Sequence, residues 1–253
     1  MTENTARRRW TRNELIRAFN LYCQTPFGKI HNKNPAIIAL AASLGRSASA
    51  VSWKLANFAR LDPTLAKRNI KGASHGSKEE ELIWREFDSN WEALAFESER
   101  LRLGEEALAN IASAPEFPEG RTRESLVRVR VNQDFFRRAV LNAYNSACCI
   151  TGIGIPELLC ASHIVPWSVD IKNRTNPSNG LCLNALHDRA FDRGLMAIDG
   201  DFRILVSSKI GKLRNSNLKT MLQNFEGKRI DMPQHFVPRL DFLEHHRSHI
   251  FQR

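Results

Sequence analysis

Long apolar runs are missing from this sequence. No stretch approaches the roughly 20 apolar residues that a membrane-spanning helix needs, and the opening residues, MTENTARRRW, place no apolar segment after their arginines. We therefore expect no membrane contact, no secretory signal and a cytoplasmic location. The sequence also lacks internal repeats, low-complexity tracts and a phosphate-cradling, glycine-rich loop.

Cysteine is scarce, and its spacing does not favour zinc. The chain has five cysteines, an odd number that favours reduced thiols over a disulfide framework. Cys148, Cys149, Cys160 and Cys182 form none of the CxxC pairs that mark many structural zinc sites. The sequence therefore predicts free thiols and no structural zinc.

Acidic residues are fewer than basic ones, with 27 Asp and Glu against 37 Lys and Arg. The excess is uneven, because the net charge is +10 over residues 1–75, −8 over 76–120 and +8 over 121–253. Clusters of Lys and Arg bind phosphates by Coulomb attraction and counterion release. This partition predicts a polyanion-facing domain at each end of the chain and an acidic helical linker between them.

Residues 10–62 have the pattern of three helices. Thr11 and Glu14 match a capping box at the start of the first helix, and Asn34, followed by a proline, marks the start of the second. A short turn containing Gly45 separates the second helix from the third. The sequence thus predicts a small helical domain within residues 1–75.

The stretch ALAASLGRSASAVSWKLANFARLD resembles a helix-turn-helix, and Trp10 and Trp53, as helix-packing aromatics, resemble those of Myb-like three-helix domains. In such folds the third helix enters the major groove of double-stranded DNA. The resemblance implies DNA contacts from residues on or near the outward face of that helix: Arg46, Ser49, Lys54 and Asn57. The alternative is a helical domain whose basic face is only solvated or binds another protein.

The acidic segment, residues 76–120, is predicted to be mostly helical. The small residues GASHG at 72–76 predict a hinge, and Lys78 to Leu108 is expected to form a helix. Its apolar stripe either packs against a flanking domain or pairs two subunits as a homodimer. The prolines of APEFPEG, 114–120, exclude regular helix and predict a second linker.

The C-terminal domain, 121–253, begins with residues 125–131, in which apolar and basic side chains alternate as in an edge strand. Asn132 is then expected to cap a helix that runs to about Ser146. Arg137 and Arg138 on that helix are either phosphate-binding residues or solvated arginines.

Polar side chains crowd into residues 158–194, LLCASHIVPWSVDIKNRTNPSNGLCLNALHDRAFDRG. Two apolar runs, Leu158 to Val165 and Gly180 to Leu183, predict antiparallel strands joined by a polar loop. Asn184 can cap a short helix that ends at Gly194. The predicted order is strand, loop, strand and helix.

In this arrangement His163 lies near the end of the first strand, Asn179 at the entry to the second and His187 in the first turns of the helix. These three residues, with the flanking ASHIVPW and NPSNGLCLNALHDRAFDRGL, resemble the HNH endonucleases, and among them a restriction-type branch. The resemblance implies a ββα-metal fold and a metal-dependent hydrolysis of DNA that leaves 5′-phosphates.

The same resemblance assigns a role to each of the three residues. It makes His163 the general base, a role that suits a neutral imidazole. Asn179 would brace the loop that aims the base. His187 would bind a divalent ion, expected to be Mg²⁺ or Mn²⁺, or else Zn²⁺ or Ni²⁺, which stabilises charge on the phosphate.

The second metal ligand is less clear. Many relatives have Asp, Glu or His immediately before the base, whereas this chain has Ser162, a poor ligand for a divalent ion. Asp192 and Asp188 on the predicted short helix are the candidates, and we choose Asp192.

The whole sequence predicts an α+β protein with an N-terminal three-helix, DNA-binding-like domain, a helical linker and a C-terminal HNH nuclease domain. The expected function is a metal-dependent endonuclease of restriction or defence type that acts on double-stranded DNA. Two alternatives stay open: a DNA-binding transcriptional regulator with an inactive nuclease fold, and an RNA or structure-specific nuclease.

Overall fold

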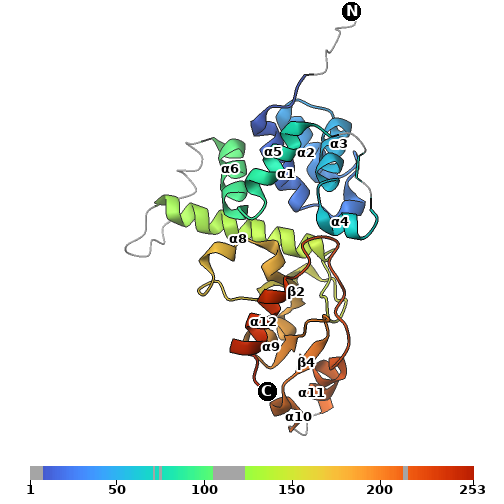
Figure 1. Ribbon diagram of the computed structural model, residues 1–253, viewed down its shortest axis with the longest axis vertical. Helices are drawn as coiled ribbons and strands as arrows, with labels where there is room; N and C mark the ends of the chain where they lie inside the picture. Colours follow the sequence, from blue (N-terminus) through green and yellow to red (C-terminus); the bar gives the residue numbers. More distant parts are fainter. Residues whose placement is uncertain (1–7, 71, 74–75, 105–122, 213–215) are drawn as a thin grey trace, which may run out of the picture. The chain divides into compact units, whose positions relative to one another are not determined.

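The structure is a computed structural model that describes residues 8–70, 72–73, 76–104, 123–212 and 216–253. Residue contacts divide the chain into two compact units, with the boundary between Val131 and Asn132. We call them the helical unit and the C-terminal unit and describe each by itself (Figure 1). The predicted linker at 114–120 and part of the predicted hinge at 72–76 lie outside the described residues.

The helical unit begins with α1 (Arg12–Cys23), α2 (Pro35–Leu44) and α3 (Ala48–Ala59). Thr11 and Glu14 form the predicted capping box, and the Asn34 side chain accepts a hydrogen bond from the Ala36 amide at 2.9 Å. Gly45 ends α2 with a φ of 61°, a left-handed conformation that glycine adopts without strain. The predicted starts of these helices are therefore confirmed, and α2 and α3 are bent by 109° at their turn.

The unit continues with α4 (Pro63–Lys67), α5 (Lys78–Phe87) and α6 (Trp91–Leu103). The prediction that Lys78 to Leu108 is helical is confirmed over α5 and α6, with a break at Ser89, where φ is 74°, and residues 105–108 lie outside the described residues. The Phe19 ring of α1 lies 5.1 Å from that of Trp84 and 6.3 Å from that of Trp91, measured between ring centroids. The apolar stripe of this segment therefore packs inside the helical unit. This removes the reason to expect a separate spacer or a homodimer interface at residues 76–120.

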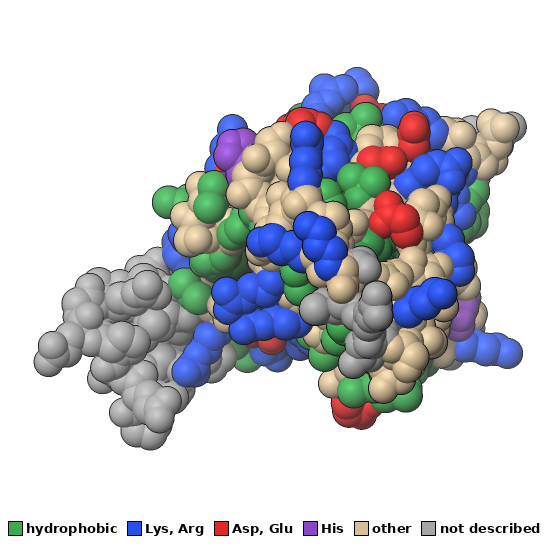
Figure 2. All heavy atoms as spheres, turned by 90° about the horizontal axis from the view of Figure 1, so that it is seen from below, with side chains coloured by type: hydrophobic (Ala, Val, Ile, Leu, Met, Phe, Trp, Pro, Cys, Tyr) green, Lys and Arg blue, Asp and Glu red, His purple; other side chains and the backbone are tan. Residues whose placement is uncertain are grey.

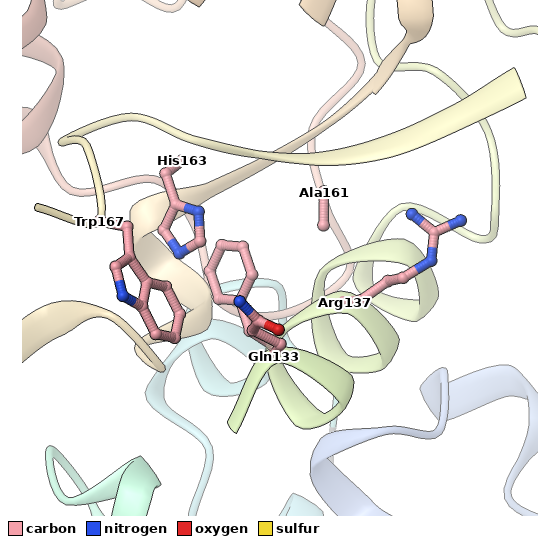
Figure 3. A pocket seen from close by; sticks show the side chains of 6 residues that line it. Gln133, Arg137, Ala161, His163 and Trp167 are labelled. Atoms are coloured by element: carbon pink, nitrogen blue, oxygen red, sulfur yellow. The ribbon is translucent and has the colours of Figure 1, made fainter. Parts of the chain in front are cut away.

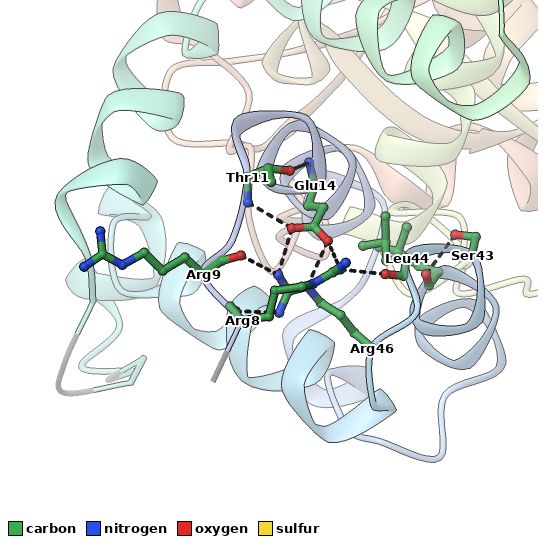
Figure 4. A network of polar contacts seen from close by, with 8 residues as sticks. Arg8, Arg9, Thr11, Glu14, Ser43, Leu44 and Arg46 are labelled. Atoms are coloured by element: carbon green, nitrogen blue, oxygen red, sulfur yellow. Dashed lines mark hydrogen bonds and ion pairs between the residues drawn. The ribbon is translucent and has the colours of Figure 1, made fainter. Parts of the chain in front are cut away.

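Arg46, one of the residues predicted to read DNA, is held within the helical unit (Figure 4). Its guanidinium donates to the Glu14 carboxylate at 2.8 and 3.0 Å and lies 4.1 Å from the centre of the Trp10 ring. Only 8% of the side chain is exposed. The prediction that Arg46 faces DNA is therefore wrong, because the carboxylate at the start of α1 binds it.

Two further residues of α3 also point inward. Lys54 and Asn57 both donate to the carboxylate of Glu80, which is 0% exposed, and their expected outward orientation is therefore wrong. A buried carboxylate is costly unless cations and donors satisfy it, and these two side chains do so. Ser49 is exposed as predicted, whereas Trp53 is 62% exposed instead of packing between helices.

The helix α8 (Arg123–Ala143) replaces the predicted strand and helix at the start of the C-terminal region. The edge strand expected at 125–131 is wrong, and Asn132 lies within the helix, 4% exposed, instead of capping it. Buried residues from Phe135 to Ala143 recur every three to four positions, so the helical period prevails over a short alternation.

The remaining elements of the C-terminal unit are β1 (Leu159–His163), β2 (Gly180–Asn184), α9 (Ala185–Asp192), β3 (Met196–Ile198), β4 (Ile204–Val206), α10 (Ser208–Gly211), α11 (Ser216–Met221) and α12 (Leu240–His249). β1 and β2 form an antiparallel pair, and β3 and β4 form a second one. The helix α9 packs on the first pair and on β3. The predicted order of strand, loop, strand and helix is therefore confirmed.

Candidate active site

The β1–β2 hairpin brings the ends of its loop together beside α8. Its register pairs His163 with Gly180, the residue that follows Asn179. A Cβ atom on Gly180 would lie 2.3 Å from Val140 Cγ2 and 3.0 Å from Phe136 Cζ. Glycine is therefore required at this position for the hairpin to approach α8 so closely.

The contacts of His163 fix both its tautomer and its ring plane. Its Nε2 atom lies 2.9 Å from the carbonyl oxygen of Arg174. Because a carbonyl oxygen only accepts, Nε2 carries the proton and donates, which leaves Nδ1 with a free lone pair. The ring stacks on Phe136 with 3.8 Å between centroids, and Trp167 meets its edge at 5.5 Å.

The surroundings also keep His163 neutral. Burial lowers the pKa of His163 below its ordinary value of 6.5, although the hydrogen bond to the Arg174 carbonyl and the Asp188 carboxylate act in the opposite direction. A neutral imidazole with a free Nδ1 is the form that can accept a proton from water.

Asn179 joins the two ends of the loop between β1 and β2. Its side-chain oxygen accepts from the Val165 amide at 2.8 Å, and its side-chain nitrogen donates to the Val165 carbonyl at 3.1 Å and to the Asn173 carbonyl at 3.3 Å. Its own carbonyl accepts from Ile164 at 2.9 Å, and the residue is fully buried. Asn179 therefore holds in place the chain that follows His163.

His187 lies at the start of α9, as predicted, but it does not face the site. Its Nδ1 atom lies 3.1 Å from the Asn184 side-chain oxygen, and its Nε2 atom lies 3.0 Å from the Met221 carbonyl oxygen. The residue is 2% exposed, and burial lowers its pKa despite the hydrogen bond to Met221. Both ring nitrogens face protein atoms, so the structure does not present His187 as an open metal ligand.

Asp188, the next residue of α9, points in a different direction from His187, because one residue along a helix turns the side chain by about 100°, and its charge acts on His163. Asp192 follows four positions later, on the same helical face. Burial, the charge of Asp188 and a hydrogen bond to Asp188 raise the pKa of the Cys160 thiol. Desolvation and the charge of Asp188 likewise raise the pKa of Asp192. The two carboxylates therefore repel each other next to β1.

A pocket of about 260 Å³ opens beside His163. Its lining residues come from α8, from β1 and from the loop after β1: Gln133, Phe136, Arg137, Ala161, His163 and Trp167. In Figure 3, Trp167 lies on one side of His163, and Gln133 and Arg137 lie on the other. Trp167 and Gln133 were missed by the sequence analysis, although an aromatic residue within a polar loop was a usable signal.

Residues 148–199 match the HNH_2 family, which is described as HNH endonuclease. The chain therefore carries a C-terminal HNH domain. A search of curated proteins found no match. None of the described helices alone is long and apolar enough to cross a membrane, and only the bent pair of α2 and α3 passes that test by length and composition.

The donors of the HNH domain fit a hard divalent cation at one place. Among the described residues, no group of three or more His, Cys, Asp and Glu side chains is arranged to hold a metal ion by itself. Asp188 and Asp192 nevertheless form a carboxylate pair on one helical face, and such oxygen ligands suit Mg²⁺ or Mn²⁺. Desolvation and then the charge of Asp188 raise the pKa of Asp192, and a bound cation would offset both effects.

The other polar residues predicted for this domain have ordinary surroundings. All five cysteines are free thiols, as predicted, and burial with nearby cysteines raises the pKa of Cys182 to about 12. Arg137 lines the pocket, whereas Arg138 is exposed and lies 3.6 Å from the Asp134 carboxylate. Arg137 is therefore the better placed of the two to reach a ligand beside His163.

Proposed function

We propose that this protein is a metal-dependent DNA endonuclease of restriction or defence type that leaves 5′-phosphates. The observation that carries the proposal is the placement of His163. Its Nε2 donates a hydrogen bond to the Arg174 carbonyl, and its ring borders an open pocket. The HNH match of residues 148–199 gives the same reaction class.

His163 acts as the general base in this proposal. Water bound beside Nδ1 gives its proton to the imidazole as it attacks the phosphorus. The stacked Phe136 ring and the loop held by Asn179 keep the imidazole aimed, so little reorganisation accompanies the proton transfer.

Asp188 and Asp192 would hold the metal ion, in place of the His187 expected from the sequence. A bound divalent ion would stabilise negative charge on the phosphate and on the leaving 3′ oxygen. Arg137, which is exposed at the pocket, would bind a neighbouring phosphate.

Charge supports a polyanionic substrate. Residues 121–253 have a net charge of +8, and the face drawn in Figure 2 carries many Lys and Arg side chains with few Asp and Glu among them. Such surfaces bind the phosphate backbone of DNA.

The helical unit would supply sequence preference. The 109° bend between α2 and α3 falls in the range typical of helix-turn-helix motifs. Of the four residues predicted to contact DNA from this unit, Ser49 is the one that lies exposed, at the start of α3. Trp53 of the same helix is also exposed.

The proposal is tested by incubating supercoiled plasmid with the full chain and Mg²⁺ or Mn²⁺, with EDTA as a control. We expect nicking or linearisation that EDTA abolishes and that falls by about 10² to 10⁴-fold in His163→Ala. His249→Ala, which removes an exposed histidine of α12, is the matched control and should cut normally.

The pH profile gives a second measurement. Because burial lowers the pKa of His163, the rate should rise with pH through a limb below 6.5 and then stay level near neutrality. Undiminished cleavage by His163→Ala would refute the proposed base, and the absence of any metal-dependent cleavage would refute the proposed function.

A further inference from the structure

We propose that the pocket beside His163 is a nucleobase subsite, in which Trp167 stacks on a base next to the scissile phosphate and Gln133 binds the edge of that base. This inference rests on the proposed nuclease function and deepens it. It adds two specificity-determining residues to the site.

Trp167 has the placement of a stacking residue. It lines the pocket instead of packing in the hydrophobic core of the C-terminal unit, and it is half-buried. Its backbone carbonyl accepts from Arg174 Nε at 2.8 Å, and the Arg174 guanidinium lies 5.2 Å from the ring centre. The indole is therefore held by the loop before any ligand binds, so stacking a base on it needs little ordering.

Gln133 supplies polar recognition in the same pocket. It is exposed on α8, one turn before Arg137, and none of the described residues hydrogen-bonds its side-chain amide. A free amide offers both donors and an acceptor, which is the group that proteins use to bind base edges. Gln133 can therefore distinguish bases without first breaking an internal contact.

The pocket has one end for a base and one for a phosphate. Trp167 lies on one side of His163 and the Arg137 guanidinium on the other, with Gln133 between them (Figure 3). A nucleotide bound with its phosphate near Arg137 would place its base against Trp167.

A base in this pocket must leave its stack, because both the ring face and the base edge are contacted there. Enzymes obtain such access from unpaired nucleotides or by extruding one from the duplex. Stacking on an aromatic side chain is worth about 1–3 kcal/mol per base, equivalent to about 5- to 150-fold in affinity.

The test pairs a change in the protein with a change in the DNA. Wild type and Trp167→Ala are compared on a duplex carrying the mapped cleavage site and on duplexes with single abasic positions around it. At one position, removing the base and removing the indole should each lower kcat/KM by about 5- to 150-fold. Making both changes should cost no more than one of them, since they remove the same contact.

Three further variants sharpen the result. Trp167→Phe should recover most of the loss on the intact duplex. Val169→Ala, which removes an exposed side chain from the same loop, is the matched control and should behave like wild type. Gln133→Ala should reduce the preference among the four bases at the same position. Equal losses for Trp167→Ala on every abasic duplex would mean that Trp167 only supports the loop, and would overturn the subsite.

The subsite can fail independently of the nuclease. The same comparison is made on the Kd of a duplex with one bulged nucleotide against a duplex with one bulged abasic position, which requires no cleavage. Loss of the difference between these two probes in Trp167→Ala supports the subsite even if no cutting is seen. Equal binding of both probes by wild type overturns it, even if cutting is normal.

Discussion

The two units use their charged side chains differently. In the helical unit, the carboxylates of Glu14 and Glu80 lie under the surface, and each is bound by a cation from another helix or turn. In the C-terminal unit, Arg137 lines a pocket instead, and none of the described residues forms an ion pair with Asp188. Formal charge is similar at the two ends of the chain, so what distinguishes a functional charge is the lack of an oppositely charged partner.

The largest expected effect comes from changing a carboxylate with which none of the described residues forms an ion pair. Asp188→Asn should lower kcat/KM by at least roughly 100-fold, because losing a metal-site group costs that much or more. Its thermal stability should be unchanged or slightly higher, since the substitution removes a like-charge contact with Asp192. The checks are plasmid cleavage and thermal unfolding of the same preparation, and a fall in both would contradict the assigned role.

The opposite result is expected for the internal pair of the helical unit. Glu80→Ala should cost about 3–5 kcal/mol of unfolding free energy, because it leaves the buried Lys54 without its carboxylate. The combined change Lys54→Met and Glu80→Leu should recover most of that loss, since apolar groups of similar size need no partner. Chemical denaturation measures both. A stable Glu80→Ala protein would show that Lys54 is free to act elsewhere.

The difference between the units also explains what the sequence could predict. Most local signals were reliable: the capping box at Thr11, the asparagine cap at Asn34 and the strand, loop, strand and helix order around His163 all appear in the structure, whereas the strand expected at 125–131 does not. Each of these depends on neighbours within a few residues.

Long-range partners were not predictable in this way. Lys54 looked like a surface residue of a recognition helix because Glu80, 26 positions away, is invisible to a helical pattern. The hydrogen bond between His187, the predicted metal ligand, and the Met221 carbonyl was likewise not foreseeable, because Met221 lies 34 positions away. In both cases a buried polar side chain is hydrogen-bonded to a residue far away in the sequence. Such a contact depends on the tertiary fold and leaves no local sequence signal.

Two histidines of the C-terminal unit differ in a similar way, because His163 lines a pocket whereas His246 is buried. His246 resembles His163, because it stacks on Phe191 and its Nε2 donates to the Phe191 carbonyl, but it is 1% exposed. Burial lowers the pKa of His246 to about 4, against 6.5 for an ordinary histidine. His246 is therefore protonated below pH 6.5 in the unfolded chain, but only below about pH 4 in the folded chain.

Stability should consequently fall as the pH drops from 6.5 towards 4, by up to about 3 kcal/mol from this residue. Urea unfolding at a series of pH values measures the slope, and His246→Phe should flatten it while lowering stability at neutral pH. An unchanged slope in that variant would mean that His246 is accessible to protons in the folded protein.

The smallest expected effect separates a phosphate contact from a structural ion pair. Arg137 borders the pocket, whereas Arg12 forms an exposed pair with Glu86 in the helical unit. Each phosphate contact releases condensed counterions, so Arg137→Ala should weaken binding to every DNA sequence and reduce the slope of log Kd against log salt by about 1. Arg12→Ala should leave that slope unchanged and alter stability by less than about 1 kcal/mol, as exposed pairs do. Titrations of two unrelated duplexes at several salt concentrations make the measurement. If Arg137→Ala weakened binding to one duplex only and kept the full salt slope, its guanidinium would contact a base, and the phosphate end of the pocket would have to lie elsewhere.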